Sequence, residues 1–380
     1  MAENKGLKLD AASLRAYTMI AALALIWLYF HWATGGIFMT PRNLSNLMVQ
    51  MSVTGVLAVG MLMVIVSGNI DLSVGSVIGL LGGVMAVLLT SKGWGLAPAL
   101  LVAILAGVAI GAFHGALVAY ANIPAFIVTL GGLLAWRGAI KGLSAGETIP
   151  IAQASFKSFG QQYIAKGAGW ALAAAAVLGL IGLVLARARA QRQHGLGEVN
   201  PVKMALSEAV PAAVIIAFTY IMNAYAGVPI PVLILLAVAG LGAFLTNNTT
   251  FGRYLYAIGG NPDAARLSGI NLKHYILGVY GLLGALTAVA AVIYTARVGS
   301  ASPDAGVLKE LDAIAACVIG GASLMGGRGT IFGACVGALI MASLDNGMSL
   351  LNVKDFMQDI IKGSILVAAV GLDMVGRRRG

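Results

Sequence analysis

The sequence predicts an all-α fold, a polytopic transmembrane helical bundle, from its composition and from the length of its apolar runs. Of the 380 residues, 59% are hydrophobic and only 10% are charged, whereas soluble domains carry roughly 25% charged residues. The apolar runs approach the roughly 20 residues that a helix needs to cross a bilayer. Strands of a membrane barrel would be shorter and would alternate polar with apolar residues, so helices are the spanning elements that fit.

The apolar runs predict about twelve spans in one transmembrane domain that covers residues 1–380. The run at 311–324 is short for a complete crossing, which indicates a broken or partial span. In chain order, the predicted spans cover residues 17–32, 48–66, 70–90, 97–121, 126–143, 170–186, 206–226, 231–246, 275–296, 311–324, 331–350 and 357–373.

The basic residues predict how these spans are oriented. With about twelve spans, most Lys and Arg residues between them fall on one side, which is expected to be cytoplasmic. Both termini then lie in the cytoplasm, with a loop at 187–205 and a second loop at 247–274. The net charge of +10 follows from this distribution and does not indicate nucleic-acid binding. The basic residues on this side are Lys5, Lys8, Arg15, Arg187, Arg189, Arg192, Lys203, Arg253, Arg266, Lys273, Arg377, Arg378 and Arg379.

The polar stretch at 251–271 is unusual in so apolar a chain. Within it, Asn261 is a good helix N-cap and Pro262 a good first helical residue. Asp263 complements the positive end of the helix dipole, and Gly269 is a natural stop. The stretch therefore predicts one or two turns of helix over residues 262–268.

This short helix is expected to contact a soluble partner. Ala264 and Leu267 would lie on one face, and Asp263 and Arg266 on another. A capped helix with a small apolar face between two membrane spans is a suitable docking element.

A second polar segment interrupts two apolar runs at Asn69, Asp71 and Ser73. An ionisable residue inside the membrane costs at least about 2.5 kcal/mol and indicates a specific role. Three roles are open for Asp71: a helix cap at a break, in which Asp71 or Ser73 accepts bonds from the next helix, a polar lining of a transport pathway, or a proton site.

A weak internal repeat relates residues 65–79 to residues 318–333. Each segment is an apolar run, a polar break that contains glycine, and a second apolar run. Paired broken segments in two halves of a membrane protein are typical of a transport pathway. Glycines spaced by four, such as Gly107, Gly111 and Gly115, instead indicate close packing of helices.

The chain carries no motif for bond chemistry. Gly326-Gly327-Arg328-Gly329 lacks the Gly-Lys-Ser/Thr ending of a phosphate-binding loop. No Ser/His/Asp set or HExxH motif is recognisable, the four histidines form no ligand-spaced cluster, and Cys317 and Cys335 fit small buried hydrophobic residues. We predict no catalytic residue, no metal site and no bound cofactor.

Several of these segments resemble the signatures of ribose-type sugar permeases, the membrane subunits of bacterial ATP-binding-cassette importers. The resembling segments are 70–76, 123–130, 257–270 and 318–329, and the likeness runs in order from about residue 43 to residue 373. The chain is most similar to the D-xylose-transporting members, because residues 170–246 hold three spans where the ribose permeases have one. The resemblance thus implies a core of about ten spans with an inserted helix pair.

The resemblance implies an inner-membrane permease that imports a pentose, D-xylose, and hydrolyses no ATP itself. Its implied partners are cytoplasmic ATPase subunits, a periplasmic sugar-binding protein, a second permease copy and the monosaccharide. The binding protein would arrive at the loops 144–169 and 297–310, which carry Lys157, Lys166 and Lys309. Ribose permeases tend to have paired glycines near Asn69, so no pathway role is transferred to that residue.

The resemblance also identifies helix 262–268 as the coupling helix that contacts the ATPase. The coupling residues are Gly259, Gly260, Asn261, Pro262, Asp263, Ala264, Arg266, Leu267 and Ser268, and the pathway candidates are Asn69, Asp71 and Ser73. One alternative is a proton-coupled sugar transporter that uses Asp71, although such a carrier needs no docking helix. A membrane scaffold or receptor without transport is the other.

Overall fold

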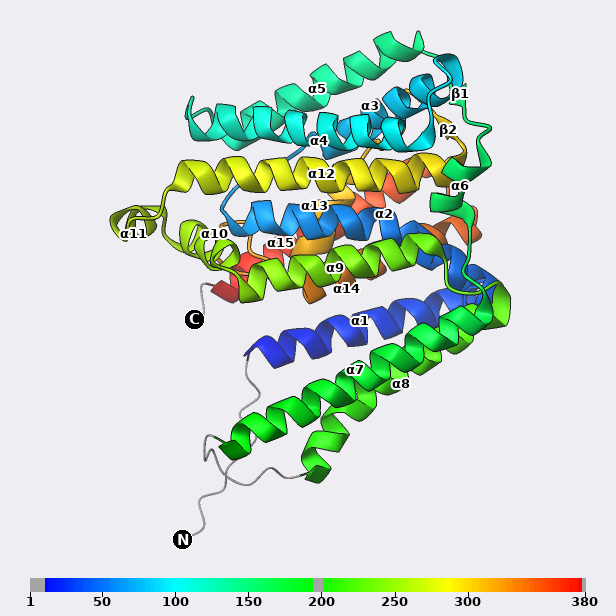
Figure 1. Cartoon of the computed structure of the whole chain (residues 1–380), viewed down its shortest axis with the longest axis vertical. Helices are drawn as coiled ribbons and strands as arrows, with labels where there is room; N and C mark the ends of the chain where they lie inside the picture. Colours follow the sequence, from blue (N-terminus) through cyan, green and yellow to red (C-terminus); the bar gives the residue numbers. More distant parts are fainter. Residues whose placement is uncertain (1–10, 194–200, 378–380) are drawn as a thin grey trace.

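The computed structural model describes residues 11–193 and 201–377, which are almost entirely helical (Figure 1). The strands β1 and β2 are two residues each and pair antiparallel, with Ile149 opposite Ala301. The elements are α1 (Ala11–Ala33), α2 (Pro41–Val66), α3 (Val74–Ala86), the π-helical η1 (Val87–Ser91), α4 (Leu96–Ala119), α5 (Ala125–Ser144), β1 (Ile149–Pro150), α6 (Ala154–Gln161), α7 (Lys166–Gln193), α8 (Pro201–Tyr225), α9 (Ile230–Asn248), α10 (Thr250–Gly260), α11 (Pro262–Leu267), α12 (Leu272–Val298), β2 (Ser300–Ala301), α13 (Lys309–Ile319), α14 (Ile331–Leu350) and α15 (Asp355–Arg377).

The helical bundle predicted from the apolar runs is confirmed. Every predicted span coincides with a helix, and nine helices among the described residues are long and apolar enough to cross a membrane. The predicted set is completed by α1, α15 and the short α13. α13 is only eleven residues long and ends at Ile319, so the run predicted as a broken span is indeed one.

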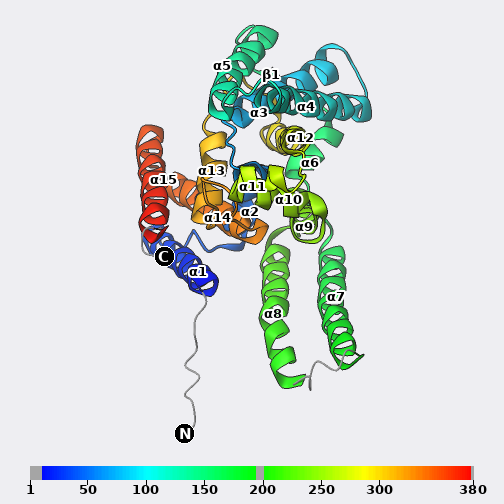
Figure 2. The same cartoon turned by 90° about the vertical axis from the view of Figure 1, so that its left-hand side faces the viewer.

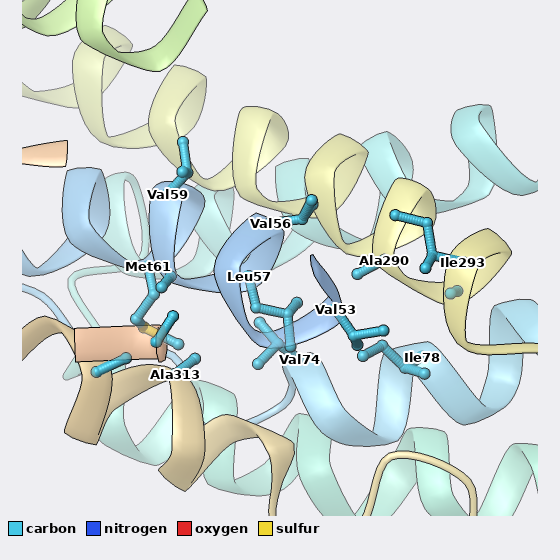
Figure 3. Close-up of a cluster of buried hydrophobic side chains, with 14 of the residues drawn as sticks. Val53, Val56, Leu57, Val59, Met61, Val74, Ile78, Ala290, Ile293 and Ala313 are labelled. Atoms are coloured by element: carbon cyan, nitrogen blue, oxygen red, sulfur yellow. The ribbon is translucent and has the colours of Figure 1, made fainter. Parts of the chain in front are cut away.

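The centre of the molecule is α2, which is apolar on all sides and buried along most of its length. Figure 3 shows Leu57 of α2 beside Val74 of α3, Val53 of α2 beside Ile78 of α3, and Ala313 of α13 near Met61 of α2. A helix without a polar face has to be surrounded by other helices, and α9, α12, α13 and α14 surround this one. Inside a bilayer, such contacts are held by close van der Waals packing.

The glycines spaced by four on α4 pack directly on α12, as their spacing predicts. A Cβ at Gly107 would overlap the carbonyl oxygen of Gly284, and one at Gly111 would overlap that of Tyr280. The two backbones can approach this closely because the α4 positions have no side chain, and at Gly284 the α12 position has none either.

Two crossings are broken. Residues 67–73 between α2 and α3, and residues 320–330 between α13 and α14, contain no helix. These are the segments that the internal repeat pairs. Irregular backbone at membrane depth is tolerated only where protein buries it or water reaches it, so the partners of these segments decide their role.

The connecting segments collect at two ends of the bundle (Figure 1). α10 and α11 lie at one end, together with the start of α1, the end of α15, the end of α7 and the start of α8. β1, β2 and α6 lie at the other end. This arrangement agrees with an even number of crossings between α1 and α15.

The helices α7 and α8 form a hairpin that projects from the rest of the bundle (Figure 2). They correspond to the inserted pair predicted from the sequence. α7 extends to Gln193 and α8 begins at Pro201, so helix occupies both ends of the predicted loop 187–205. Its middle, 194–200, lies outside the described residues.

Candidate functional site

The short helix predicted in the polar stretch is α11. The Asn261 side chain accepts a hydrogen bond from the Ala264 N–H at 3.0 Å, which makes Asn261 the N-cap, and Pro262 is the first helical residue. Asp263 lies in the first turn. The chain leaves the helix through Gly269 at φ +83°, a left-handed conformation that glycine adopts without strain.

The faces of α11 differ in detail from the prediction. Leu267 is 89% exposed, and Ala264, Asp263 and Arg266 are exposed as well. Ala265 is the one residue of this helix that is buried, at 5% exposure. The helix therefore rests on the protein through Ala265 and presents its other side chains outward, including a leucine with no described cover.

Glycines join the helix that precedes α11 to both broken crossings. Gly259, near the end of α10, lies against the carbonyl oxygen of Val66, where α2 ends. A Cβ there would also stand 2.8 Å from the Gly327 nitrogen. The Gly327 N–H in turn donates to the Val66 carbonyl at 2.9 Å. The ends of α2 and α10 and the 320–330 segment therefore meet backbone to backbone.

A tyrosine strengthens this junction. The Tyr256 hydroxyl on α10 donates to the Gly329 carbonyl at 2.7 Å. Burial raises the pKa of Tyr256, so the hydroxyl keeps its proton and remains a donor. These hydrogen bonds join α10 to residues 320–330, and through Val66 to the break that begins at residue 67.

The break after α2 is held by local and distant hydrogen bonds. The Asn69 amide donates to the Ser67 hydroxyl at 3.1 Å and to the Ser67 carbonyl at 3.3 Å. The Ile70 carbonyl accepts weak bonds, both at 3.4 Å, from Thr129 on α5 and Tyr280 on α12. These partners replace the bonds that a continuous helix would have made.

Asp71 and Ser73 are buried and bonded to each other. One Asp71 oxygen accepts from the Ser73 N–H and from the Ser73 hydroxyl, both at 2.7 Å. Ser73 precedes the first residue of α3, but its hydroxyl points back to Asp71 rather than to the first turn. The prediction that Asp71 or Ser73 caps α3 is therefore wrong in its geometry, because Asp71 supports the N-cap residue and bonds no later N–H.

Two further residues complete this buried cluster. The other Asp71 oxygen is 3.7 Å from His114 Nδ1 on α4, and Ser73 Oγ is 3.4 Å from the same nitrogen. The Trp136 indole on α5 donates to His114 Nε2 at 3.0 Å, which places the proton of a neutral ring on Nδ1. Sequence reasoning missed His114 and Trp136, because no spacing links them to residues so far along the chain.

The cluster holds an Asp, a Ser and a His, but its geometry does not suit nucleophilic catalysis. The Ser73 proton is committed to the carboxylate, whereas an activated serine would give it to the histidine. Asp71, Ser73 and His114 are each at most 3% exposed, so a substrate would not reach them. The cluster instead fixes α3, α4 and α5 around the break.

The described residues do not suggest redox or metal chemistry. Cys317 is buried, Cys335 is half-buried, and both are unpaired thiols, in agreement with small packing residues. Among these residues, no group of three His, Cys, Asp or Glu side chains could hold a metal ion.

A helical membrane bundle with two broken crossings, both joined to an exposed helix at one end, defines a transport protein of the permease class. Residues 43–370 match the family described as "Branched-chain amino acid transport system / permease component", and the chain belongs to this family.

Individual relatives agree with this family. The xylose transport system permease protein XylH of Escherichia coli K12 is 45% identical over 373 residues, which cover 98% of this chain and 94% of the relative. XylH of Haemophilus influenzae is 46% identical, over 98% of this chain and 99% of the relative. The ribose import permease protein RbsC of E. coli K12 is 36% identical, over 88% and 87%. No solved structure matches the chain.

Proposed function

We propose that this chain is the membrane-spanning subunit of an ATP-binding-cassette importer that takes up a pentose, D-xylose. The observation that carries the proposal is the likeness to xylose permeases along 98% of the chain, at 45% identity or more. The ribose permease matches a smaller share of the chain at lower identity, which favours xylose over ribose as the transported pentose.

The structure supports a specific route from ATP hydrolysis to the pathway. α11 would dock on a cytoplasmic ATPase subunit through its exposed side, centred on Leu267. Gly259 and Gly260 would pass the displacement to the ends of α2 and the 320–330 segment. Asn261 and Ser268 would keep α11 folded as a unit because they cap it, and Pro262 favours the start of the helix.

The remaining partners belong to the same proposal. A periplasmic binding protein would deliver the sugar at the end that holds α6 and the β1–β2 pair, and two permease copies would enclose the pathway. Both termini and α11 would be cytoplasmic, in a bacterial inner membrane. Asn69, Asp71 and Ser73 would hold the break rather than bind sugar, since the latter two are buried.

Reconstitution tests this function. The permease, with the ATPase and binding protein encoded beside its gene, is placed in liposomes, and uptake of labelled D-xylose is measured. Uptake should require ATP on the side of the membrane where the ATPase is bound. It should persist when a protonophore collapses the proton gradient. Uptake that stops with the protonophore and ignores ATP would instead establish proton coupling.

A further inference from the structure

Four charged side chains gather on three helices that the sequence separates. The Lys309 ammonium on α13 is 2.6 Å from Asp312 of the same helix and 3.7 Å from Asp345 on α14. The Lys362 ammonium on α15 is 3.3 Å from Asp312 and 3.2 Å from Asp345. Each carboxylate thus has two ammonium partners, and the set, here called the charged cluster, has no net charge.

The sequence placed Lys309 in the external loop 297–310, where a binding protein was expected to arrive. In the structure Lys309 is instead the first residue of α13 and is paired with two carboxylates.

Two members of the charged cluster, Asp345 and Lys362, lie well inside their helices, and the other two lie in the first turn of α13. Asp345 is five residues before the end of α14, and Lys362 is seven residues after the start of α15. At 1.5 Å per residue, these positions are roughly 8–10 Å from the helix ends. Charged residues at such depth do not face lipid, because hydrocarbon offers them no hydrogen bonds.

The charged cluster is nevertheless open to one side. The side chains of Lys309, Asp345 and Lys362 are 22%, 25% and 17% exposed. Asp312 and Lys362 also line a cavity between α13, α14 and α15, whose other lining residues are mostly apolar and include Leu311, Met341 and Gly363. These charges are accessible, yet they lie too deep in the helices to face lipid. We therefore expect them to be in contact with water or with a polar solute.

The chemistry of the charged cluster selects among solutes. A cation would meet two ammonium groups and an anion two carboxylates, so neither gains from all four groups. A hydroxyl donates to a carboxylate and accepts from an ammonium, and both bonds are charge-assisted. Because each charge has two partners, a hydroxyl can replace one partner and leave the charge paired. Neighbouring hydroxyls on one molecule fit this alternation.

We infer that the charged cluster Lys309–Asp312–Asp345–Lys362 is a contact site for a neutral polyhydroxylated solute on the transport pathway, an aldopentose; this inference rests on the proposed function. The location of the charged cluster gives the contact a consequence. α13 begins at Lys309 and runs directly into the 320–330 segment that touches Gly259 and Gly260. A solute bound at the charged cluster would therefore be connected through α13 and the 320–330 segment to α10 and the docking helix α11.

Cysteine labelling tests whether the cavity is reached by water and by sugar. Cys317 and Cys335 are first replaced by alanine. Gly363→Cys then places a thiol on the cavity wall, where no described atom lies within 4 Å of the new Cβ. The matched control is Ser364→Cys, the next residue at the same depth, which is exposed and is not among the cavity-lining residues described.

A membrane-impermeant thiol reagent should modify Gly363→Cys at least about tenfold faster than Ser364→Cys, because access controls thiol reactivity. D-xylose-loaded binding protein should slow the modification of Gly363→Cys, and sugar-free binding protein should not. Equal and slow modification of both thiols would overturn the inference, since lipid or a second copy would then cover the cavity. Fast modification that the sugar never slows would also overturn it.

Selectivity provides the second measurement. The double variant Asp345→Asn/Lys362→Met loses one charge of each sign and keeps the ion pair between Lys309 and Asp312. Uptake of D-xylose is compared with uptake of a second aldopentose that the same binding protein delivers. Loss of a hydroxyl contact should shift the ratio of the two rates by roughly fivefold.

A charged cluster with a purely structural role would lower both uptake rates in parallel and leave their ratio unchanged, which would refute the inference. A wild-type complex that imports no pentose would refute the proposed function instead. Labelling of Gly363→Cys and its protection are measured independently of uptake, so the two failures are distinguishable.

Discussion

Asp71 shows how a single carboxylate can hold a broken helix together. It satisfies the Ser73 N–H and hydroxyl with one oxygen and lies near His114 with the other. A buried charge at this depth is tolerated because these donors surround it. The role is therefore positional, and it makes the two oxygens of Asp71 unequal in importance.

Substitution of Asp71 separates the positional role from a proton-site role. Asp71→Asn keeps one oxygen for the Ser73 donors, so protein level and much of the uptake should remain. Asp71→Leu leaves the Ser73 N–H without a partner, at a cost of about 1–3 kcal/mol, and should impair folding or transport. Thermal unfolding of the purified protein and uptake assays measure both effects. Complete loss of uptake in both variants at normal protein level would favour the proton site.

Gly259 is the residue on which the junction of α10 with the two breaks depends. Gly259→Ala places a Cβ on the Val66 carbonyl and close to Gly327, both backbone, so the chain has to separate there. We expect a loss of stability of about 1–3 kcal/mol and weaker sugar-stimulated ATP hydrolysis. Gly281→Ala on α12 is the control, because no described atom lies within 4 Å of its Cβ. Similar behaviour of the two variants would contradict the role of the junction.

At the scale of elements, α11 was predictable because its signals are local. Asn261, Pro262 and Gly269 are neighbours in sequence, and capping depends on positions only a few residues apart. Which face of α11 is buried was not predictable in the same way. That face depends on contacts outside the helix, and the structure selects Ala265 rather than Ala264.

The exposed side of α11 yields the strongest prediction at this scale. Leu267→Glu replaces an apolar contact residue with a charge. It should not disturb the helix, because the Leu267 side chain is 89% exposed and makes little contact with the rest of the chain. The protein should insert normally, co-purify poorly with the ATPase and lose sugar-stimulated hydrolysis. Arg266→Ala should be milder, since exposed ion pairs contribute about 0–1 kcal/mol. Full ATPase association and uptake by Leu267→Glu would exclude α11 as the docking helix.

Across the whole molecule, the spans follow from the sequence and their meeting points do not. Long apolar runs define helices locally, which is why every predicted span coincides with one. The junction of Val66 with Gly259 and Gly327 joins positions far apart in the sequence, and the charged cluster joins three separate helices. The sequence predicted a break at Gly326 and Gly327, but only the structure shows that they contact Gly259.

The two ends of the bundle provide the prediction that concerns the whole molecule. α11, the start of α1 and the end of α15 share one end, while β1 and α6 occupy the other (Figure 1). The basic residues favour the α11 end for the cytoplasm. Alkaline phosphatase, which is active only outside the cytoplasm, should be silent when fused after Arg379 and active when fused after Glu147, next to β1. Expression of both fusions is checked by immunoblotting. Activity after Arg379 would place α11 outside the cell, where an ATPase could not reach it, and would remove the coupling route together with the topology.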